Sequence, residues 1–221
     1  MSAVLPAPRF GSGGAEPWAA ALRGAALSLL LVPTDPDAGS QHLDVHRWTA
    51  AADRVDRSTL DGLPGPLLDI GSGPGRMVRA ALDQGIEAYG LDADPAAVET
   101  SRAAGIPVIA GSVFDRLPGE GTWASLLLLD GNIGIGGDVA ALLARCAELL
   151  RRGGVLVAEA DPDPARDDVT DYRVRDTAGR ESDAFPWSRV GIPALLRGAH
   201  DFSLDRVWEL DGRWFVALRA S

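Results

Sequence analysis

Lysine is absent from this 221-residue sequence, in which all 21 basic residues are arginine. Reactions that need an ε-amino group, such as Schiff-base catalysis or phosphate binding by a P-loop lysine, are therefore excluded. The single cysteine, Cys146, excludes an intrachain disulfide and any site with several cysteine ligands. It falls in the apolar stripe of an expected helix, so we expect it in the core. We predict no bound metal.

Basic charge is scarce as well, because 31 acidic residues outnumber the 21 arginines and give a formal charge of −10. Such a charge opposes binding to a phosphate backbone and predicts that nucleic acid is not a partner. No run of about 18 apolar residues occurs, which predicts no membrane span. The apolar stretch 25–32 follows Glu16 and precedes two prolines, unlike a signal peptide. We therefore expect a cytoplasmic protein.

The first part of the chain differs in pattern from the rest. Residues 1–14 are predicted to be a loose arm, followed by helices over 18–31 and 41–60, before the glycines and prolines of 62–66. The second of these helices would carry His42, His46 and Trp48. We predict an N-terminal arm and helical lid over 1–59 and a main domain over 60–221.

From residue 67 onward, strand and helix patterns alternate, as in a mostly parallel sheet with helices on both faces. Strands are expected at 67–70, 87–91, 107–110, 123–129 and 155–160, with helices between them, one of them capped by Asp138. A polar segment over 161–180 and a short helix near 193–199 follow. The stretches 202–210 and 213–219 flank Asp211-Gly212, a pair that favours a type I′ turn, so the chain is expected to end in an antiparallel hairpin.

A glycine loop joins the first of these strands to the next helix, in Leu67-Leu-Asp-Ile-Gly-Ser-Gly-Pro-Gly75. Glycines there let backbone approach a ligand. Asp92, at the end of the second strand, is placed to accept hydrogen bonds from both hydroxyls of a ribose. The alternative is a tight turn and a helix-capping aspartate without a ligand. Together, loop and aspartate indicate an adenosine-containing cofactor, but Arg76 stands where the dinucleotide fingerprint has its third glycine.

The chain over 60–221 resembles class I S-adenosylmethionine-dependent methyltransferases, in which a C-terminal hairpin inserts the seventh strand antiparallel. It is similar to small actinobacterial methyltransferases of unassigned substrate at residues 127–138 and 213–219. The resemblance implies an α/β fold with a Rossmann-like seven-stranded sheet, S-adenosylmethionine as cofactor and S-adenosylhomocysteine as product. It implies cofactor contacts from Asp69, Gly71, Ser72, Gly73, Gly75, Asp92, Ala93, Ser112, Val113 and Asp130. Ser112 stands where many relatives have an acidic residue.

The acceptor is expected to be a small molecule, in a role suited to secondary metabolism. On the expected helix His42 and His46 would share a face, and His46 is the candidate base for a hydroxyl or phenol acceptor. The alternative is that both histidines are polar groups on a solvated or capping face. Asn132, Trp48 and Trp187 are candidate acceptor contacts, against the alternatives of a turn residue and of packing. Competing functions are other chemistry on S-adenosylmethionine, and a non-catalytic cofactor-binding module. The sequence leaves the oligomeric state open.

Overall fold

Two sheets, of seven and four strands, make up the fold in the computed structural model, which describes residues 10, 17–22, 28–35 and 39–221. The larger sheet has the order β10-β11-β7-β6-β3-β4-β5. Strands β3, β4, β5, β6 and β7 are parallel, whereas β11 is antiparallel to β7 and to β10. The bounds are β3 Leu67–Ile70, β4 Ala88–Asp92, β5 Val108–Ala110, β6 Trp123–Leu128, β7 Leu150–Ala160, β10 Phe202–Leu210 and β11 Arg213–Ala220.

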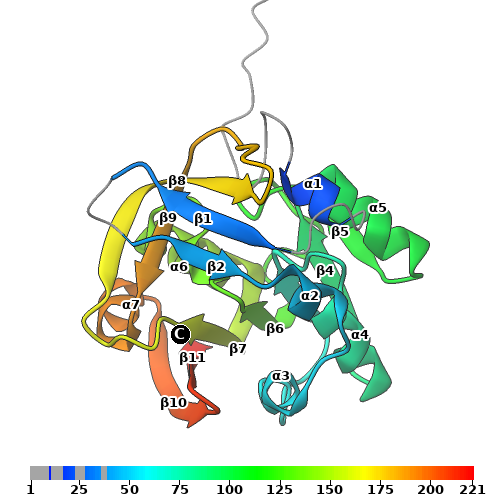
Figure 1. Ribbon diagram of the computed structural model, residues 1–221. Helices are drawn as coiled ribbons and strands as arrows, with labels where there is room; N and C mark the ends of the chain where they lie inside the picture. Colours follow the sequence, from blue (N-terminus) through cyan, green and yellow to red (C-terminus); the bar gives the residue numbers. More distant parts are fainter. Residues whose placement is uncertain (1–9, 11–16, 23–27, 36–38) are drawn as a thin grey trace, which may run out of the picture.

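Helices cover both faces of this sheet (Figure 1). One face carries α3 (Arg54–Ser58), α4 (Arg76–Asp83) and α5 (Pro95–Ala103). The other carries α6 (Val139–Leu149) and α7 (Ile192–Gly198). Each face has its own buried apolar cluster. The central strand β6 contributes side chains to both clusters and is therefore buried along its whole length. This two-sided burial explains its continuous apolar sequence.

The second sheet has the order β2-β1-β8-β9 and is antiparallel throughout. Its strands are β1 (Leu29–Pro33), β2 (Gln41–Leu43), β8 (Asp167–Asp176) and β9 (Phe185–Val190). Two short helices, α1 (Pro17–Leu22) and α2 (Val45–Thr49), accompany it, and α1 packs against α5 (Figure 1). The sheet adjoins the larger one through the 3₁₀ turn η1 (Asn132–Gly134), which β9 contacts.

The expected elements of the main domain are confirmed to within one or two residues at most ends. The fifth strand is the exception, because β7 begins at Leu150, five residues before the expected start. Asp138 caps α6 by accepting a hydrogen bond from the Ala141 amide at 3.0 Å. The C-terminal hairpin is also confirmed, since Asp211 (φ 51) and Gly212 (φ 80) both have the positive φ that a type I′ turn requires.

The helices expected before residue 60 are wrong in part. The first ends at Leu22, residues 23–27 lie outside the described residues, and 29–33 form β1. A short apolar run fits a helix or a strand equally well, and the pairing of β1 with the distant β8 decides between them. In place of the second expected helix the structure has the strand β2 and two separate helices, α2 and α3. Asp44 caps the start of α2 and Asp53 caps the start of α3. The expected loose arm over 1–14 falls outside the described residues except at Phe10.

The polar segment after β7, in which no strand was expected, contains the strand β8. In β8 the inward-facing residues Tyr172 and Val174 alternate with exposed charged residues, which is the pattern of a half-buried strand. Since β8 pairs with β1, residues before and after the predicted boundary at 59 share one sheet. The two-part division of the chain stays a prediction.

Two further observations concern membrane-spanning helices and the single cysteine. No helix within the described ranges is long and apolar enough to cross a membrane. Cys146 is fully buried in the apolar cluster beneath α6, where burial raises the pKa of its thiol to about 12. This agrees with a core role for the cysteine.

Gly212→Ala should destabilise the protein by about 1–2 kcal/mol, because a Cβ is unfavourable in the left-handed conformation of the hairpin turn. Urea unfolding followed by circular dichroism would measure the change. Gly39→Ala is the matched control, since Gly39 has open space around it and no positive φ. Equal effects of the two substitutions would contradict this account of the turn.

Candidate active site

The glycine loop and Asp92 meet at the carboxyl ends of β3 and β4, as adjacent parallel strands require. The Asp92 carboxylate accepts hydrogen bonds from the Gly73 and Asp94 amides, each at 2.8 Å. Gly71, Gly73 and Gly75 all have positive φ, which is why the loop needs glycine. A Cβ on Gly73 would meet no atom within 4 Å, so this side of the loop is open to a ligand.

At this edge Asp69, which is buried, and Asp92, which is half-buried, are hard to ionise. Burial raises the pKa of Asp69 to about 8, with Arg76 acting in the opposite direction. Burial also raises the pKa of Asp92 to about 6, against the amide hydrogen bonds from Asp94 and Gly73. A cation placed beside either group would favour its charged form.

A pocket of about 590 Å³ lies beside the ends of β4 and β5 and is lined by Ala93, Pro95, Val98, Glu99, Arg102, Ala103 and Ala110. Its volume suits a small organic ligand. Ser112 follows β5, and its amide donates to Asp115 at 2.8 Å. Ser72 presents a buried hydroxyl that lacks a hydrogen-bond partner in the described part of the chain. The open side of the glycine loop, the Asp92 carboxylate, which can accept hydrogen bonds from a ribose, and the neighbouring pocket together fit an adenosine-containing cofactor.

Asn132 joins the loop after β6 to the glycine loop. Its side-chain amide donates to the carbonyl oxygens of Ile70 at 2.9 Å and of Gly71 at 3.0 Å. A Cβ on Gly71 would lie 2.6 Å from the Asn132 amide nitrogen, so the close approach also requires glycine there. The structure thus assigns Asn132 a loop-positioning contact, and its contact with an acceptor stays a prediction.

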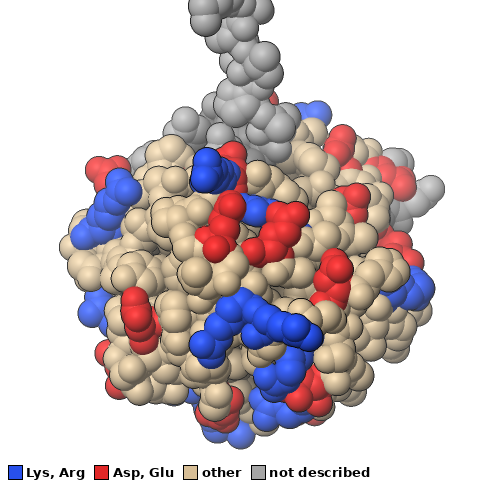
Figure 2. Space-filling model, turned by 180° about the vertical axis from the view of Figure 1, so that it is seen from behind, with Lys and Arg blue, Asp and Glu red and all other residues tan. Residues whose placement is uncertain are grey.

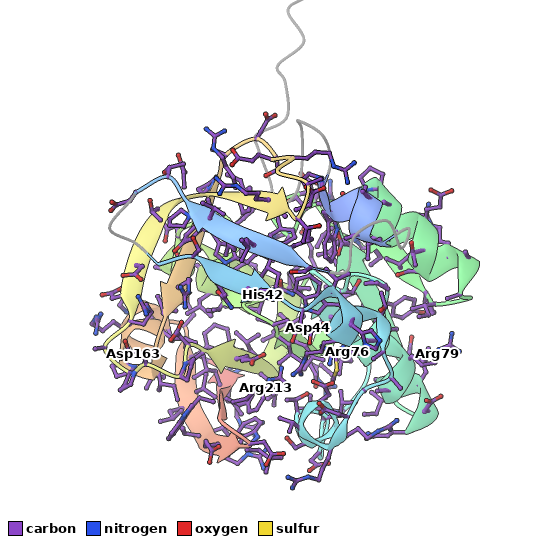
Figure 3. The ribbon with its side chains drawn as sticks, viewed as in Figure 1. His42, Asp44, Arg76, Arg79, Asp163 and Arg213 are labelled. Atoms are coloured by element: carbon purple, nitrogen blue, oxygen red, sulfur yellow. The ribbon has the colours of Figure 1, made fainter. Side chains whose placement is uncertain are left out.

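A cluster of six charged side chains, here named the ion cluster, lies at the same edge. It consists of Asp56, Asp130, Glu159, Arg47, Arg76 and Arg213. Arg213 donates to Glu159 through two nitrogens, at 2.7 and 2.6 Å, and contacts Asp56 at 2.8 Å and Asp130 at 3.2 Å. Arg76 bridges Asp56 and Asp130 from the start of α4. Figure 3 shows Arg76 and Arg213 in the middle of the molecule below β2, with Arg79 and Asp163 on opposite flanks.

The ion cluster is electrically balanced, with three carboxylates facing three guanidinium groups. Asp56 and Arg76 are its buried members, with side chains 1% and 4% exposed, whereas Arg47 is 28% exposed. Burial opposes ionisation of Asp56, yet Arg76, Arg213 and Arg47 hold its pKa below the ordinary value. Asp130 was expected to contact the cofactor; its side chain contacts Arg76 and Arg213, and its backbone amide donates to Glu159 at 2.7 Å.

The expected acceptor residues divide into two groups. Trp48 and Trp187 belong to one apolar cluster on the inner face of the second sheet. His42 and His46 do not share a helix face as expected, because His42 lies in β2 and His46 in α2. Both histidines are exposed, and the His42 ring lies 2.7 Å from the Ser28 hydroxyl. Within the described ranges, no group of three histidine, cysteine or acidic side chains is arranged to hold a metal.

Sequence reasoning missed most of the ion cluster. Asp56, Glu159 and Arg213 come from distant parts of the chain. Asp56 and Glu159 stand in no recognisable motif, and Arg213 is marked only as the first residue of the stretch 213–219. A further signal is positional, since Glu159 lies one residue before the end of β7 and Arg213 begins the neighbouring strand β11.

Arg213→Met should destabilise the protein by about 3–5 kcal/mol, because it leaves Glu159 without its guanidinium partner and removes one of the counter-charges of Asp56 and Asp130. Arg54→Met is the control: Arg54 and Asp211 form an exposed pair, so its loss should cost at most about 1 kcal/mol. Denaturant unfolding of both variants gives the comparison, and a small effect of Arg213→Met would show that the ion cluster contributes little to stability.

Comparison with known proteins agrees with this geometry. Residues 68–158 match the family described as methyltransferase domain. A search of curated protein sequences found no significant match. A similar structure is a SAM-dependent methyltransferase from Bacteroides fragilis in complex with S-adenosyl-L-homocysteine, with a TM-score of 0.75, 21% identity and coverage of 92% of each chain.

Two further similar structures have assigned activities. One is CalS10, an amino pentose methyltransferase from Micromonospora echinaspora involved in calicheamicin biosynthesis, with a TM-score of 0.54 and 19% identity over 76% of this chain and 87% of that chain. The other is the 1,6-didemethyltoxoflavin-N1-methyltransferase of Burkholderia thailandensis, with a TM-score of 0.55 and 19% identity over 86% and 95%.

The family match covers the glycine loop, Asp92 and Asp130, and the similar structures share the fold on which these residues lie. Residues 68–158 thus match a methyltransferase domain, and the chain shares its fold with S-adenosylmethionine-dependent methyltransferases of known structure.

Proposed function

We propose that this enzyme methylates a small-molecule acceptor, held between the carboxyl edge of the larger sheet and the second sheet. The observation that carries the proposal is the contact of the second sheet with the loop after β6. Trp187 of β9 pairs with Ile135, and a Cβ on Gly134 would lie 2.2 Å from the Ser188 carbonyl oxygen. A close cover of this kind favours a compact acceptor over a macromolecule.

Charge and surface support the same acceptor class. The formal charge is −10, and Figure 2 shows acidic side chains beside the basic ones on the face seen from behind. A nucleic-acid substrate is disfavoured by this distribution. The similar structures with assigned activities act on an amino pentose and on 1,6-didemethyltoxoflavin, and CalS10 takes part in biosynthesis of the natural product calicheamicin. We extend this to a small molecule of secondary metabolism, with the enzyme in the cytoplasm.

Cofactor binding is proposed for the edge formed by β3, β4 and β5. S-Adenosylmethionine supplies an electrophilic methyl group on a cationic sulfur when bound. Asp92 would bind the ribose, Ala93, Ser112 and Val113 the adenine, and Asp69 with the glycine loop the methionine part. Asp130 remains a predicted cofactor contact beside its role in the ion cluster. A cofactor amino group next to Asp69 would lower the pKa of that carboxyl from its raised value.

Alignment of acceptor and methyl group is expected to supply much of the rate acceleration. Asn132 would hold the loop after β6, here named the acceptor loop, against the glycine loop. His46 remains the predicted base for an acceptor that must lose a proton. His46 is exposed at the start of α2, next to Arg47 of the ion cluster. Other chemistry on the same cofactor is the competing function, which product analysis would reveal by the absence of a methylated product.

Asp92→Ala should weaken binding of S-adenosylhomocysteine by about 1.5–3 kcal/mol, the range for hydrogen bonds to a charged group. Titration calorimetry measures this directly. Asp94→Ala is the matched control, because Asp94 lies in the same loop but caps α5 through the Ala97 amide. Unchanged affinity in a folded Asp92→Ala protein would remove Asp92 from the site.

Asp69→Asn should stabilise the unliganded protein, and the gain should grow with pH. The pKa of Asp69 is raised to about 8 in the folded protein from an ordinary 3.8. The wild type therefore loses stability relative to the variant as pH rises from about 4 to about 8, and the difference is constant above that. Urea unfolding at pH 5, 7 and 9 tests this, and weaker S-adenosylhomocysteine binding by the variant should accompany the gain. A pH-independent difference would contradict it.

A further inference from the structure

A pocket of about 230 Å³ lies along one side of α4 and is here named the α4 pocket. The helix lines it with residues three or four positions apart, which share one helix face: Arg76, Arg79, Ala80 and Asp83. The rest of the lining comes from residues 48–52, Arg57 of α3, Gly75 and Ile106. None of these residues lines the pocket beside β4 and β5, so the two pockets are separate.

The charges of the α4 pocket do not cancel. Four charged side chains line it, namely Arg57, Arg76, Arg79 and Asp83. The charge of Arg76 is already matched, because this residue bridges two carboxylates of the balanced ion cluster. Of the other three side chains, two are positive and one is negative. The pocket is therefore left with an excess of one positive charge, in a chain whose formal charge is −10.

The two arginines behind this excess are available to a ligand. Arg57 is exposed, and its guanidinium has no ion pair or hydrogen bond with any residue that the structure describes. Arg79 is also exposed and donates to the Ala104 carbonyl oxygen at 2.6 Å, which uses one of its five N–H groups. Figure 3 shows Arg79 on the flank of the molecule, away from Arg76 and Arg213. A guanidinium without an acidic partner is suited to bind a carboxylate through two N–H groups.

Most of the remaining lining is apolar. It includes the half-buried Trp48, the buried Ile106 and the small side chains of Ala80 and of the alanines in 50–52. An indole offers a flat apolar surface, and alanines leave room for the body of a ligand. A phosphate group carries about 1.5 to 2 negative charges at pH 7, which is more than the excess charge of the pocket and would be repelled by Asp83. One negative charge on an apolar body matches the lining better.

We propose that the α4 pocket binds a small organic acid, a monocarboxylate with an apolar body, whose carboxylate is held by Arg57 and Arg79. The apolar body lies against Trp48 and the alanines. The site is additional to the cofactor edge, and its inference does not rest on the proposed function. Because Gly75 and Arg76 also line the pocket, its ligand adjoins both the end of the glycine loop and the ion cluster.

Titration calorimetry of the full-length protein with four probes tests the proposal. Benzoate is the reference, benzamide has its shape without the charge, acetate has the charge without the ring, and inorganic phosphate has a larger charge. We expect benzoate to bind at least about 10-fold more tightly than benzamide and about 5-fold more tightly than acetate, since charge and apolar body both contribute. Phosphate should bind more weakly than benzoate. Saturation with S-adenosylhomocysteine should change benzoate affinity less than about 3-fold, because the cofactor edge is a separate site.

Substitutions in the lining place the benzoate in this pocket. Arg57→Gln and Arg79→Gln should each weaken benzoate binding at least about 5-fold, because each removes a charged hydrogen-bond donor. Asp83→Asn should have the opposite effect and tighten binding at least about 2-fold, because it removes a negative charge from the lining. Arg54→Gln is the matched control: Arg54 is an exposed arginine of the same helix as Arg57, but it pairs with Asp211 and does not line the pocket. It should leave benzoate affinity unchanged.

No detectable benzoate binding, or equal affinity for benzoate and benzamide, would overturn the proposal, as would wild-type affinity in the folded arginine variants. Tighter binding of phosphate than of benzoate would contradict an organic acid as the ligand. Loss of benzoate binding in the presence of S-adenosylhomocysteine would assign the pocket to the cofactor and contradict an additional site. If circular dichroism shows that Arg79→Gln is unfolded, Arg57→Gln decides the test, because Arg57 makes no side-chain hydrogen bond or ion pair with the described residues.

Discussion

Charge balance at the carboxyl edge of the larger sheet is the constraint on which the rest of the site depends. The side chains of Asp56 and Arg76 are almost completely buried, and such groups are tolerated only when their charges are paired. Each member of the ion cluster therefore fixes the position of its partners. Because these partners belong to α2, α3, α4, β7, β11 and the loop after β6, one network holds six elements in register.

The same network reaches the loops that would contact the ligands. Arg213 binds Glu159, which accepts a hydrogen bond from the Asp130 amide at the start of the acceptor loop. Two residues further on, Asn132 binds the carbonyls of the glycine loop. The last strand of the chain is thereby connected to the loop proposed to hold the cofactor. This connection gives the C-terminal hairpin a role beyond completing the sheet.

We propose that the second sheet determines which acceptor the protein binds. It is assembled from the N-terminal strands β1 and β2 and from β8 and β9, inserted between β7 and α7. Its inner face presents aromatic rings toward the loop after β6, and none of the four strands lies within the matched family region 68–158. The matched region thus carries the proposed cofactor edge, while the second sheet supplies the proposed cover of the acceptor.

The sequence alone determined the parallel sheet, the glycine loop, Asp92 and the C-terminal hairpin, because each rests on local chemistry. Glycines at positive φ, an aspartate ending a strand and an Asp-Gly turn impose their geometry on a few neighbouring residues. Only the tertiary structure decided that residues 29–33 form a strand, since their apolar run fits either structure until β8 pairs with it. The ion cluster likewise required the fold, because its members are distant in sequence and become neighbours through long-range packing.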